Sequence, residues 1–95
     1  DQDYREQTRS KVIRERERLA AALARLGLNS LPSQANFLLA QADRPTAREL
    51  YESLKARGIL VRYFNSPGLD DKLRITVGTP DPNNALLAAL AELIP

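Results

Sequence analysis

The 95-residue sequence lacks cysteine, histidine, tryptophan and methionine. Without cysteine the chain can form neither a disulfide nor a thiolate metal site, and without histidine it has no imidazole to bind a metal. The same two absences exclude Ser-His and Cys-His nucleophile systems. We therefore expect no metal site and no hydrolytic site of these classes within the chain.

Long apolar runs and a large excess of one charge are also missing. No run approaches the roughly 20 apolar residues that a helix needs to cross a bilayer, so we expect no membrane partner. The net charge is only +2, because 14 basic residues are interleaved with 12 acidic ones. This balance argues against an electrostatic nucleic-acid-binding surface.

The pattern of apolar residues predicts one small domain over residues 1–95. With only three Tyr and two Phe, its core must consist mainly of Leu, Ile, Val and Ala. Helices are expected near 3–26, 46–57 and 81–94. Strands are expected near 35–40, where the residues are apolar enough for a mostly buried strand, and near 59–61 and 73–77. In the last strand, residues 73, 75 and 77 are expected on one face and residues 74 and 76 on the other. This order, α-β-α-β-β-α, favours an α+β fold. We predict a two-layer α/β sandwich in which helices cover one face of a small, mainly antiparallel sheet.

Capping residues support these boundaries. Gly27 is a natural end for the first helix, and Thr46 with Glu49 forms a capping box for the second. Asp81 is expected to cap the third helix, with Pro82 at its first position. The first helix is long for so small a domain and has little to bury in its first half. We therefore expect that end to pack on something outside this chain.

The segment from Arg57 to Gly78 carries the clearest functional signal. Arg62 ends the first of its two apolar runs, and Arg74 lies near the start of the second. An antiparallel hairpin would bring both guanidinium groups to the same end of the sheet. Two like charges held close are unfavourable unless an anion or a carboxylate lies between them. The pair therefore predicts a site that binds a phosphate or a carboxylate.

A simpler interpretation of the two arginines stays open at this stage. Isolated charges on strands are common and keep sheet edges soluble, which would explain Arg62 and Arg74 without any ligand. Two neighbours share this ambiguity. Tyr63 either flanks a ligand or closes the hairpin end over the core, and Asn36 either bonds locally or faces a ligand.

The three lysines do not suit covalent chemistry. A Schiff-base lysine needs an apolar pocket or cationic neighbours that favour its neutral form. Lys11 lies on a polar helix, Lys55 at a helix end, and Lys72 directly after two aspartates. No glycine-rich phosphate loop and no pair of acid–base carboxylates accompanies them. We predict no catalytic residue in this chain.

Three blocks of the sequence resemble a known family. They are SQANF at 33–37, RGILVR at 57–62 and LRITVGT at 73–79. Together they resemble the C-terminal small domain of the histidinol-phosphate aminotransferases, which are fold-type-I pyridoxal-phosphate enzymes of class I/II. The resemblance runs in order through the whole chain but covers only the final part of such an enzyme.

The resemblance implies roles for both arginines. Arg74 corresponds to the arginine that binds the carboxylate of glutamate or the phosphate of the other substrate, and Arg62 to one that contributes to phosphate recognition. The parent enzyme would transfer an amino group between L-histidinol phosphate and 2-oxoglutarate in histidine biosynthesis, as a cytoplasmic homodimer. Asn36 and Tyr63 stay candidate neighbours of the substrate on the grounds given above, beside their local roles.

The resemblance also places the pyridoxal phosphate site in a large domain absent from this chain. We therefore expect this chain to bind no cofactor and to be inactive alone. Its expected partners are the large domain, an anionic substrate and, through exposed apolar surface, other copies of itself. Two alternatives remain: another pyridoxal-phosphate aminotransferase or a threonine-phosphate decarboxylase, and a free-standing, non-catalytic interaction or ligand-sensing domain.

Overall fold

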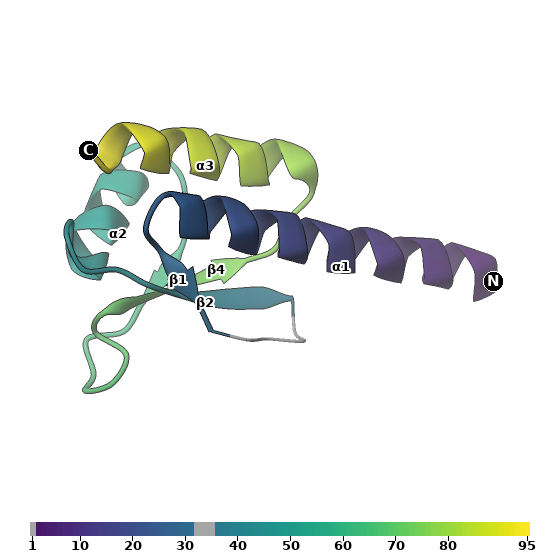
Figure 1. Ribbon diagram of the computed structural model, residues 1–95, viewed down its shortest axis with the longest axis horizontal. Coiled ribbons are helices and arrows are strands. Elements are labelled where there is room, and N and C mark those ends of the chain that lie inside the picture. Colours follow the sequence, from purple (N-terminus) through teal and green to yellow (C-terminus); the bar gives the residue numbers. More distant parts are fainter. Residues whose placement is uncertain (1, 32–35) are drawn as a thin grey trace.

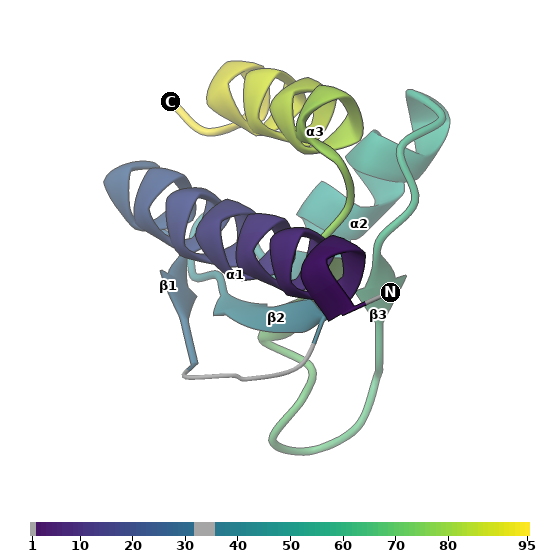
Figure 2. The same cartoon turned by 90° about the vertical axis from the view of Figure 1, so that its right-hand side faces the viewer.

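The computed structural model describes residues 2–31 and 36–95 and shows helices packed on one face of a four-stranded antiparallel sheet (Figures 1 and 2). The elements are α1 (Gln2–Arg25), β1 (Asn29–Ser30), β2 (Phe37–Gln41), α2 (Ala47–Ala56), β3 (Arg62–Tyr63), β4 (Lys72–Thr76) and α3 (Pro80–Leu93). The strand order is β1-β2-β4-β3. The predicted α+β class is confirmed, with the helices on one face of the sheet.

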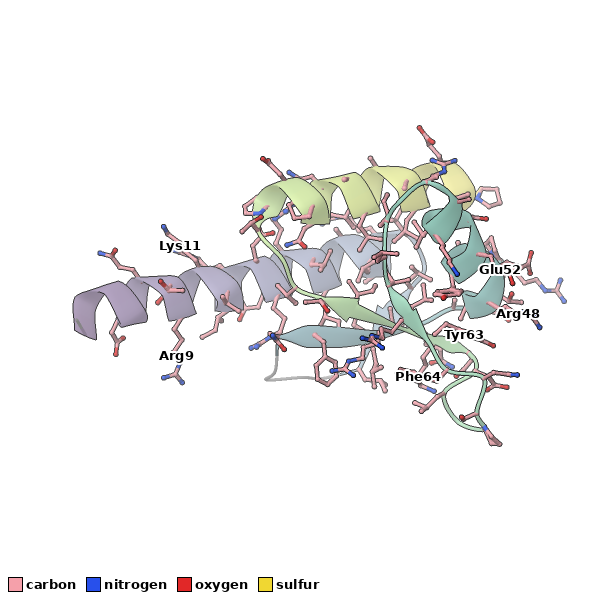
Figure 3. All side chains as sticks on the ribbon, turned by 180° about the vertical axis from the view of Figure 1, so that it is seen from behind. Arg9, Lys11, Arg48, Glu52, Tyr63 and Phe64 are labelled. Carbon is pink, nitrogen blue, oxygen red and sulfur yellow. The ribbon has the colours of Figure 1, made fainter. Side chains whose placement is uncertain are left out.

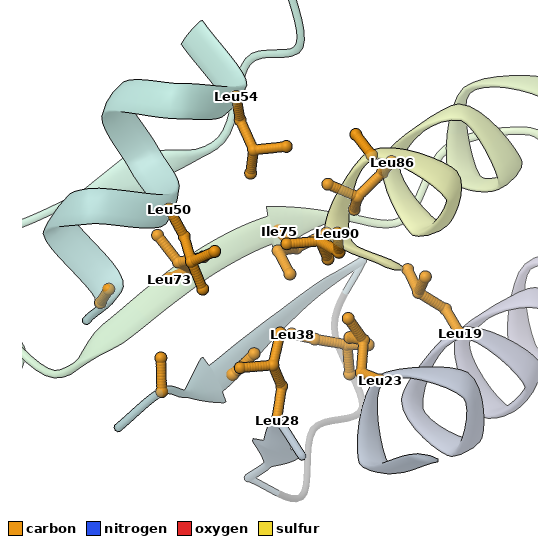
Figure 4. Packing of buried hydrophobic residues seen from close by; sticks show 14 of the residues in the cluster. Leu19, Leu23, Leu28, Leu38, Leu50, Leu54, Leu73, Ile75, Leu86 and Leu90 are labelled. Atoms are coloured by element: carbon orange, nitrogen blue, oxygen red, sulfur yellow. The ribbon is translucent and has the colours of Figure 1, made fainter. Parts of the chain in front are cut away.

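Strand β4 separates the core from the open face of the sheet. Its Leu73 and Ile75 are buried under the helices, whereas Arg74 and Thr76 are exposed on the other face. This alternation agrees with the sequence, because successive side chains of a strand point to opposite faces. Figure 4 shows how β4 packs against leucines from all three helices. The fully buried members include Leu19, Leu23, Leu50, Leu54, Leu73, Ile75 and Leu90.

Strand β2 differs from the prediction of a mostly buried strand. Its Leu38 and Ala40 are buried, but Phe37 and Leu39 are only half-buried on the open face. Only one face of the sheet carries helices, so every second residue of β2 lacks a cover. The open face is therefore partly apolar rather than simply polar around Arg74.

The structure contains one strand that the sequence did not predict. Strand β1 has two residues, which pair with Ala40 and Gln41 of β2. Two residues are too few to show an alternating pattern, so no sequence signal marks this strand. The chain reaches it directly after Gly27, whose φ of +90° ends α1 in the left-handed region as predicted.

The first leg of the predicted hairpin lies further along the chain than expected. We predicted a strand at 59–61, but β3 covers only residues 62–63. Gly58 has a φ of +78°, and the amide of Ile59 donates to the carbonyl of Leu54 at 2.9 Å. Residues 59–61 therefore serve to close α2 and bring the chain to the sheet edge, which leaves only Arg62 and Tyr63 to pair.

Helix α3 also begins earlier than predicted. Its N-cap is Thr79, with Pro80 at the first helical position, whereas we expected Asp81 followed by Pro82. Both prolines suit the first turn of a helix, and the structure uses the earlier one. Asp81 instead lies in the first turn, where a negative charge is favourable near the helix N-terminus. The capping box of Thr46 and Glu49 on α2 is present as predicted.

Helix α1 extends well beyond the sheet at its N-terminal end (Figure 1). The molecule measures 43 × 26 × 22 Å, and α1 runs along its longest direction. Residues 6–12 are exposed, whereas Leu19 and Leu23 further along are buried. The described part of the first half of the helix thus buries little, as the sequence predicted. Helix α1 is also polar and charged, and no helix of the described residues is long and apolar enough to span a membrane.

A buried asparagine joins α1, α3 and the end of β4. Asn83 is only 3 % exposed, and its side-chain oxygen accepts from the Gly78 amide at 3.0 Å. Its side-chain nitrogen donates to the Gly78 carbonyl at 2.8 Å and to the Glu15 carboxylate at 2.6 Å. Asn83 therefore pairs both backbone groups of Gly78, much as a neighbouring strand would.

The Glu15 carboxylate is held from two sides. Besides the Asn83 amide, it accepts two hydrogen bonds from Arg18, at 2.7 and 2.9 Å. The bonds from Arg18, and then that from Asn83, lower the pKa of Glu15 from 4.5 to about 2. The spacing of three residues on a helix brings Glu15 and Arg18 together, but no local pattern in the sequence reveals Asn83 as a third member.

This network predicts how stability responds to acid. The depressed pKa of Glu15 contributes stability that is present above pH 4.5 and is lost as the pH falls towards about 2. We therefore expect Glu15→Gln to be less stable than wild type at neutral pH, and this difference to shrink across that window. Urea unfolding of both proteins between pH 7 and pH 2 measures it.

Glu52→Gln is the matched control. In the wild type, the Glu52 carboxylate pairs with Arg48 at 3.5 Å on an exposed surface of α2, where such pairs contribute little to stability. Its unfolding free energy should follow that of wild type throughout. A Glu15→Gln deficit that persists undiminished at pH 2 would contradict the assignment.

Candidate functional site

The structure places Arg62 and Arg74 directly opposite each other. They are register partners in the antiparallel pair β3–β4, and both are exposed. Partners across a ladder project to the same face of a sheet, which here is the face without helices. The two arginines that the sequence singled out therefore share one surface, as predicted.

Neither arginine has a charged partner among the described residues. Arg18, Arg48, Arg57 and Lys72 form ion pairs there, whereas Arg62 and Arg74 do not. Arg62 and Arg74 thus stand opposite each other with no carboxylate between them. Like charges in this position are unfavourable, and an anion bound between them would remove the repulsion.

A surface hollow of about 450 Å³ adjoins the two arginines. It lies at the edge of the sheet around β3, and its position can be followed from Tyr63 and Phe64 in Figure 3. The hollow is lined by Tyr51, Leu60, Val61, Arg62, Tyr63, Phe64, Arg74 and Thr76. Its volume is in the range of small-molecule sites, and its lining combines aromatic rings with two cations. Such a lining suits an anionic group attached to an apolar or flat body.

Tyr63 serves the core and also borders the hollow. It is opposite Leu73 in the register, and its ring lies 5.8 Å from that of Tyr51. Because it neighbours Arg62 along the strand, its side chain points to the helix side of the sheet. Of the two alternatives for Tyr63, packing over the core is therefore observed, while its role towards a substrate stays a prediction.

Asn36 lies outside the hollow. Its carbonyl accepts from the amide of Val77 at 2.7 Å, which extends the β2–β4 ladder by one residue. Its side chain is exposed. The structure thus shows a local backbone role for Asn36, and the predicted proximity to substrate remains untested.

Phe37 is the residue that the sequence analysis missed. Its ring lies under the Arg74 guanidinium, with 4.3 Å between the ring centre and the Arg74 Cζ atom. Phe37 pairs with Thr76, so Arg74 reaches it diagonally across the β2–β4 pair. The contact depends on the register between two strands 37 positions apart in sequence. No local pattern reveals such a register.

The lysines offer no site for covalent binding of a carbonyl cofactor. The Lys72 ammonium donates to the carbonyl of Gly68 and to the carboxylate of Asp71, both at 2.8 Å. Lys55 lies at the end of α2 with its ammonium 5.9 Å from the Tyr51 ring centre, and Lys11 is exposed on α1. Lys72 is ion-paired, and Lys11 and Lys55 are exposed, so none of the three is desolvated in the way that a Schiff-base lysine requires. The described residues also contain no group of three or more acidic, His or Cys side chains that could hold a metal.

Comparison with known proteins identifies the family. The model of the aminotransferase class I and II family matches residues 1–90. The chain belongs to this family. Two relatives, from Roseiflexus castenholzii and Nostoc sp., are named histidinol-phosphate aminotransferases and are each 50 % identical to this chain. They align with 98 % and 99 % of this chain, which spans 26 % and 27 % of their lengths.

Solved aminotransferase structures share the fold. The histidinol-phosphate aminotransferase of Clostridium acetobutylicum matches with a TM-score of 0.85 and 29 % identity, covering 97 % of this chain and 29 % of that one. The enzyme of Sinorhizobium meliloti, solved in complex with pyridoxal-5'-phosphate, matches with a TM-score of 0.83 and 35 % identity. That match covers 99 % of this chain and 26 % of the other. The chain therefore spans about a quarter of the length of the aminotransferases that it resembles.

The pairing of Arg62 with Arg74 predicts that salt and anions change the stability of the domain. We expect Arg62→Gln to increase the unfolding free energy at low ionic strength by about 0.2–1 kcal/mol, because it removes a like-charge pair across the ladder. Added salt should screen the repulsion and reduce the gain. Inorganic phosphate should stabilise wild type more than Arg62→Gln. Denaturant unfolding with and without phosphate at constant ionic strength measures both effects.

Arg48→Gln is the control for removing an arginine elsewhere. Its side chain is 68 % exposed on α2 and pairs with a carboxylate rather than facing another cation. This variant should gain no stability and keep the full response to phosphate. A loss of stability in Arg62→Gln would contradict the repulsion.

Proposed function

We propose that this chain is the C-terminal small domain of a pyridoxal-phosphate-dependent histidinol-phosphate aminotransferase and supplies part of its substrate site. The single observation that carries the proposal is the register pairing of Arg62 with Arg74, without a carboxylate partner among the described residues. The names of the relatives agree with a substrate that bears a phosphate. The parent enzyme would exchange an amino group between L-histidinol phosphate and 2-oxoglutarate in the cytoplasm.

The role of the chain in this reaction is recognition. Guanidinium groups form charge-assisted, often bidentate hydrogen bonds to phosphate and carboxylate oxygens. Two of them on one face can fix the position and the orientation of an anionic substrate. Holding a reactant in place lowers the entropic part of the barrier to reaction. The aromatic side of the hollow would receive the uncharged part of the same molecule.

Pyridoxal phosphate supplies the amino-transfer chemistry in enzymes of this family. The lysines of this chain do not fit a covalent cofactor site, for the reasons given above. The proposal therefore assigns cofactor binding to the rest of the complete enzyme and expects no transamination by this chain alone. The remaining contribution of the chain is to bind and orient the anionic group of the substrate.

Kinetics of the complete enzyme test the proposal. Arg74→Ala should reduce kcat/KM for L-histidinol phosphate, for 2-oxoglutarate or for both. The expected loss of transition-state stabilisation is about 2–5 kcal/mol, the range for losing one partner of a desolvated charge pair. This corresponds to a decrease of about 30-fold or more. Steady-state kinetics with both substrates measure it, and a panel of other amino donors tests the substrate assignment.

Arg48→Ala provides the matched control, since it removes an arginine from an exposed surface of α2 that is not part of the hollow. It should leave kcat/KM unchanged. Wild-type kcat/KM for both substrates in Arg74→Ala would refute the recognition role.

The proposed partners include the large domain and further copies of this chain. Several large apolar side chains are exposed in the described part of the chain: Val12, Leu31, Leu60, Phe64 and Leu69, with Leu60 at 81 %. Part of the open sheet face is also apolar, because Phe37 and Leu39 are only half-buried there. An isolated domain with such a surface is expected to associate with itself.

Sedimentation of the 95-residue chain tests this expectation. We predict a mass larger than one chain, which decreases on dilution. Leu60→Ser should weaken the association, because it removes the most exposed apolar side chain without touching the core. A strictly monomeric chain at all concentrations would contradict the prediction.

A further inference from the structure

Phe37, a residue outside the arginine pair, contacts the Arg74 side chain. The Arg74 guanidinium lies over the Phe37 ring, with 4.3 Å between its Cζ and the ring centre. The positive charge thus rests on the negative face of the aromatic system, a favourable arrangement.

The donors of Arg74 are available in the described part of the chain. None of its N–H groups donates a hydrogen bond to another described residue. Arg74 also forms no ion pair with another described residue. Its N–H groups can therefore donate to an anion while the guanidinium stays over the ring. A carboxylate partner would hold Arg74 equally well but would occupy the same donors.

Phe37 is held in place by the sheet. Phe37 is half-buried and lies in β2, which is paired with β4 over five successive residue pairs. The same ladder carries Arg74, so the backbones of the two residues keep a fixed separation. Arg62, opposite Arg74 on the other side of β4, repels its charge. Attraction to the Phe37 ring and repulsion from Arg62 both favour the position of the Arg74 guanidinium over the ring.

We propose that Phe37 is a positioning residue, which holds the Arg74 guanidinium over its ring with the donors free for the anionic group of the substrate. The inference rests on the proposed role of Arg74 and extends it to a residue that need not touch the substrate. Phe37 restricts the conformations of the free Arg74 side chain, so Arg74 loses less conformational entropy when the anion binds. A smaller entropy loss gives a higher affinity, which is the effect called preorganisation.

Three variants of the complete enzyme test the proposal. Phe37→Leu keeps an apolar side chain but removes the ring, and it should raise KM for the substrate that Arg74 binds by about threefold to tenfold. kcat should change less than KM, because the interaction serves binding in the ground state and the transition state alike. Phe37→Tyr retains the ring face and should recover most of the affinity. Thermal unfolding of each variant checks that the fold is retained.

A double-mutant comparison separates positioning from a merely structural role. In an Arg74→Ala background, Phe37→Leu should add less than about a twofold change in KM, because its effect passes through the missing guanidinium. An equal effect of Phe37→Leu with and without Arg74 would overturn the inference. An unchanged KM in Phe37→Leu alone would overturn it as well.

The outcomes also distinguish this inference from the proposed function. If Arg74→Ala raises KM but Phe37→Leu does not, the recognition role stands and only the positioning role fails. If Arg74→Ala leaves KM unchanged, the recognition role fails, and the positioning role fails with it.

Discussion

The antiparallel pairing of β4 with its two neighbours is the constraint on which the rest of the structure depends. β4 pairs with β2 along its whole length and with β3 at Arg74 and Leu73. Its alternation sends Leu73 and Ile75 to the core and Arg74 to the open face. A shift of one residue in this register would exchange the two sets, exposing the core and burying the charge. The hydrophobic core and the arginine pair are therefore specified by the same strand.

Hydrogen bonds from a buried asparagine hold the chain just beyond the end of β4. β3 is too short to cover all of β4, and beyond their pairing the Asn83 amide binds both backbone groups of Gly78. Through the Glu15 carboxylate, the same side chain ties α1 to the start of α3. The long helix, the sheet and the last helix thus meet at one buried polar group, whose hydrogen-bonding capacity is largely satisfied. Buried polar groups with such partners help to define one arrangement of the elements.

Much of this architecture could be predicted from the sequence, because its signals are local. The capping box at Thr46 and the glycines after α1 and α2 mark boundaries that the structure confirms. The alternation in residues 73–77 identified which side chains face the core. Where signals were absent or duplicated, the predictions were wrong: β1 is too short to show a pattern, and two prolines competed to begin α3.

The residues of the candidate site could be predicted from the sequence only in part. Arg62 and Arg74 could be selected because both lie at the ends of apolar runs joined by a turn. Phe37 and Asn83 could not, because their partners are distant in sequence and depend on register and helix packing. The strand that contains Arg62 was also placed too early, although the arginine itself lies where a hairpin would put it. The two charges could thus be read from the sequence, whereas the ring beneath Arg74 could be seen only in the structure.

The most direct test of this account is a crystal structure of the complete enzyme with L-histidinol phosphate bound. The account predicts that the guanidinium groups of Arg62 and Arg74 both donate hydrogen bonds to one anionic group of the substrate, on the sheet face without helices. Substrate whose anionic group binds away from both arginines, with their side chains still in solvent, would contradict it.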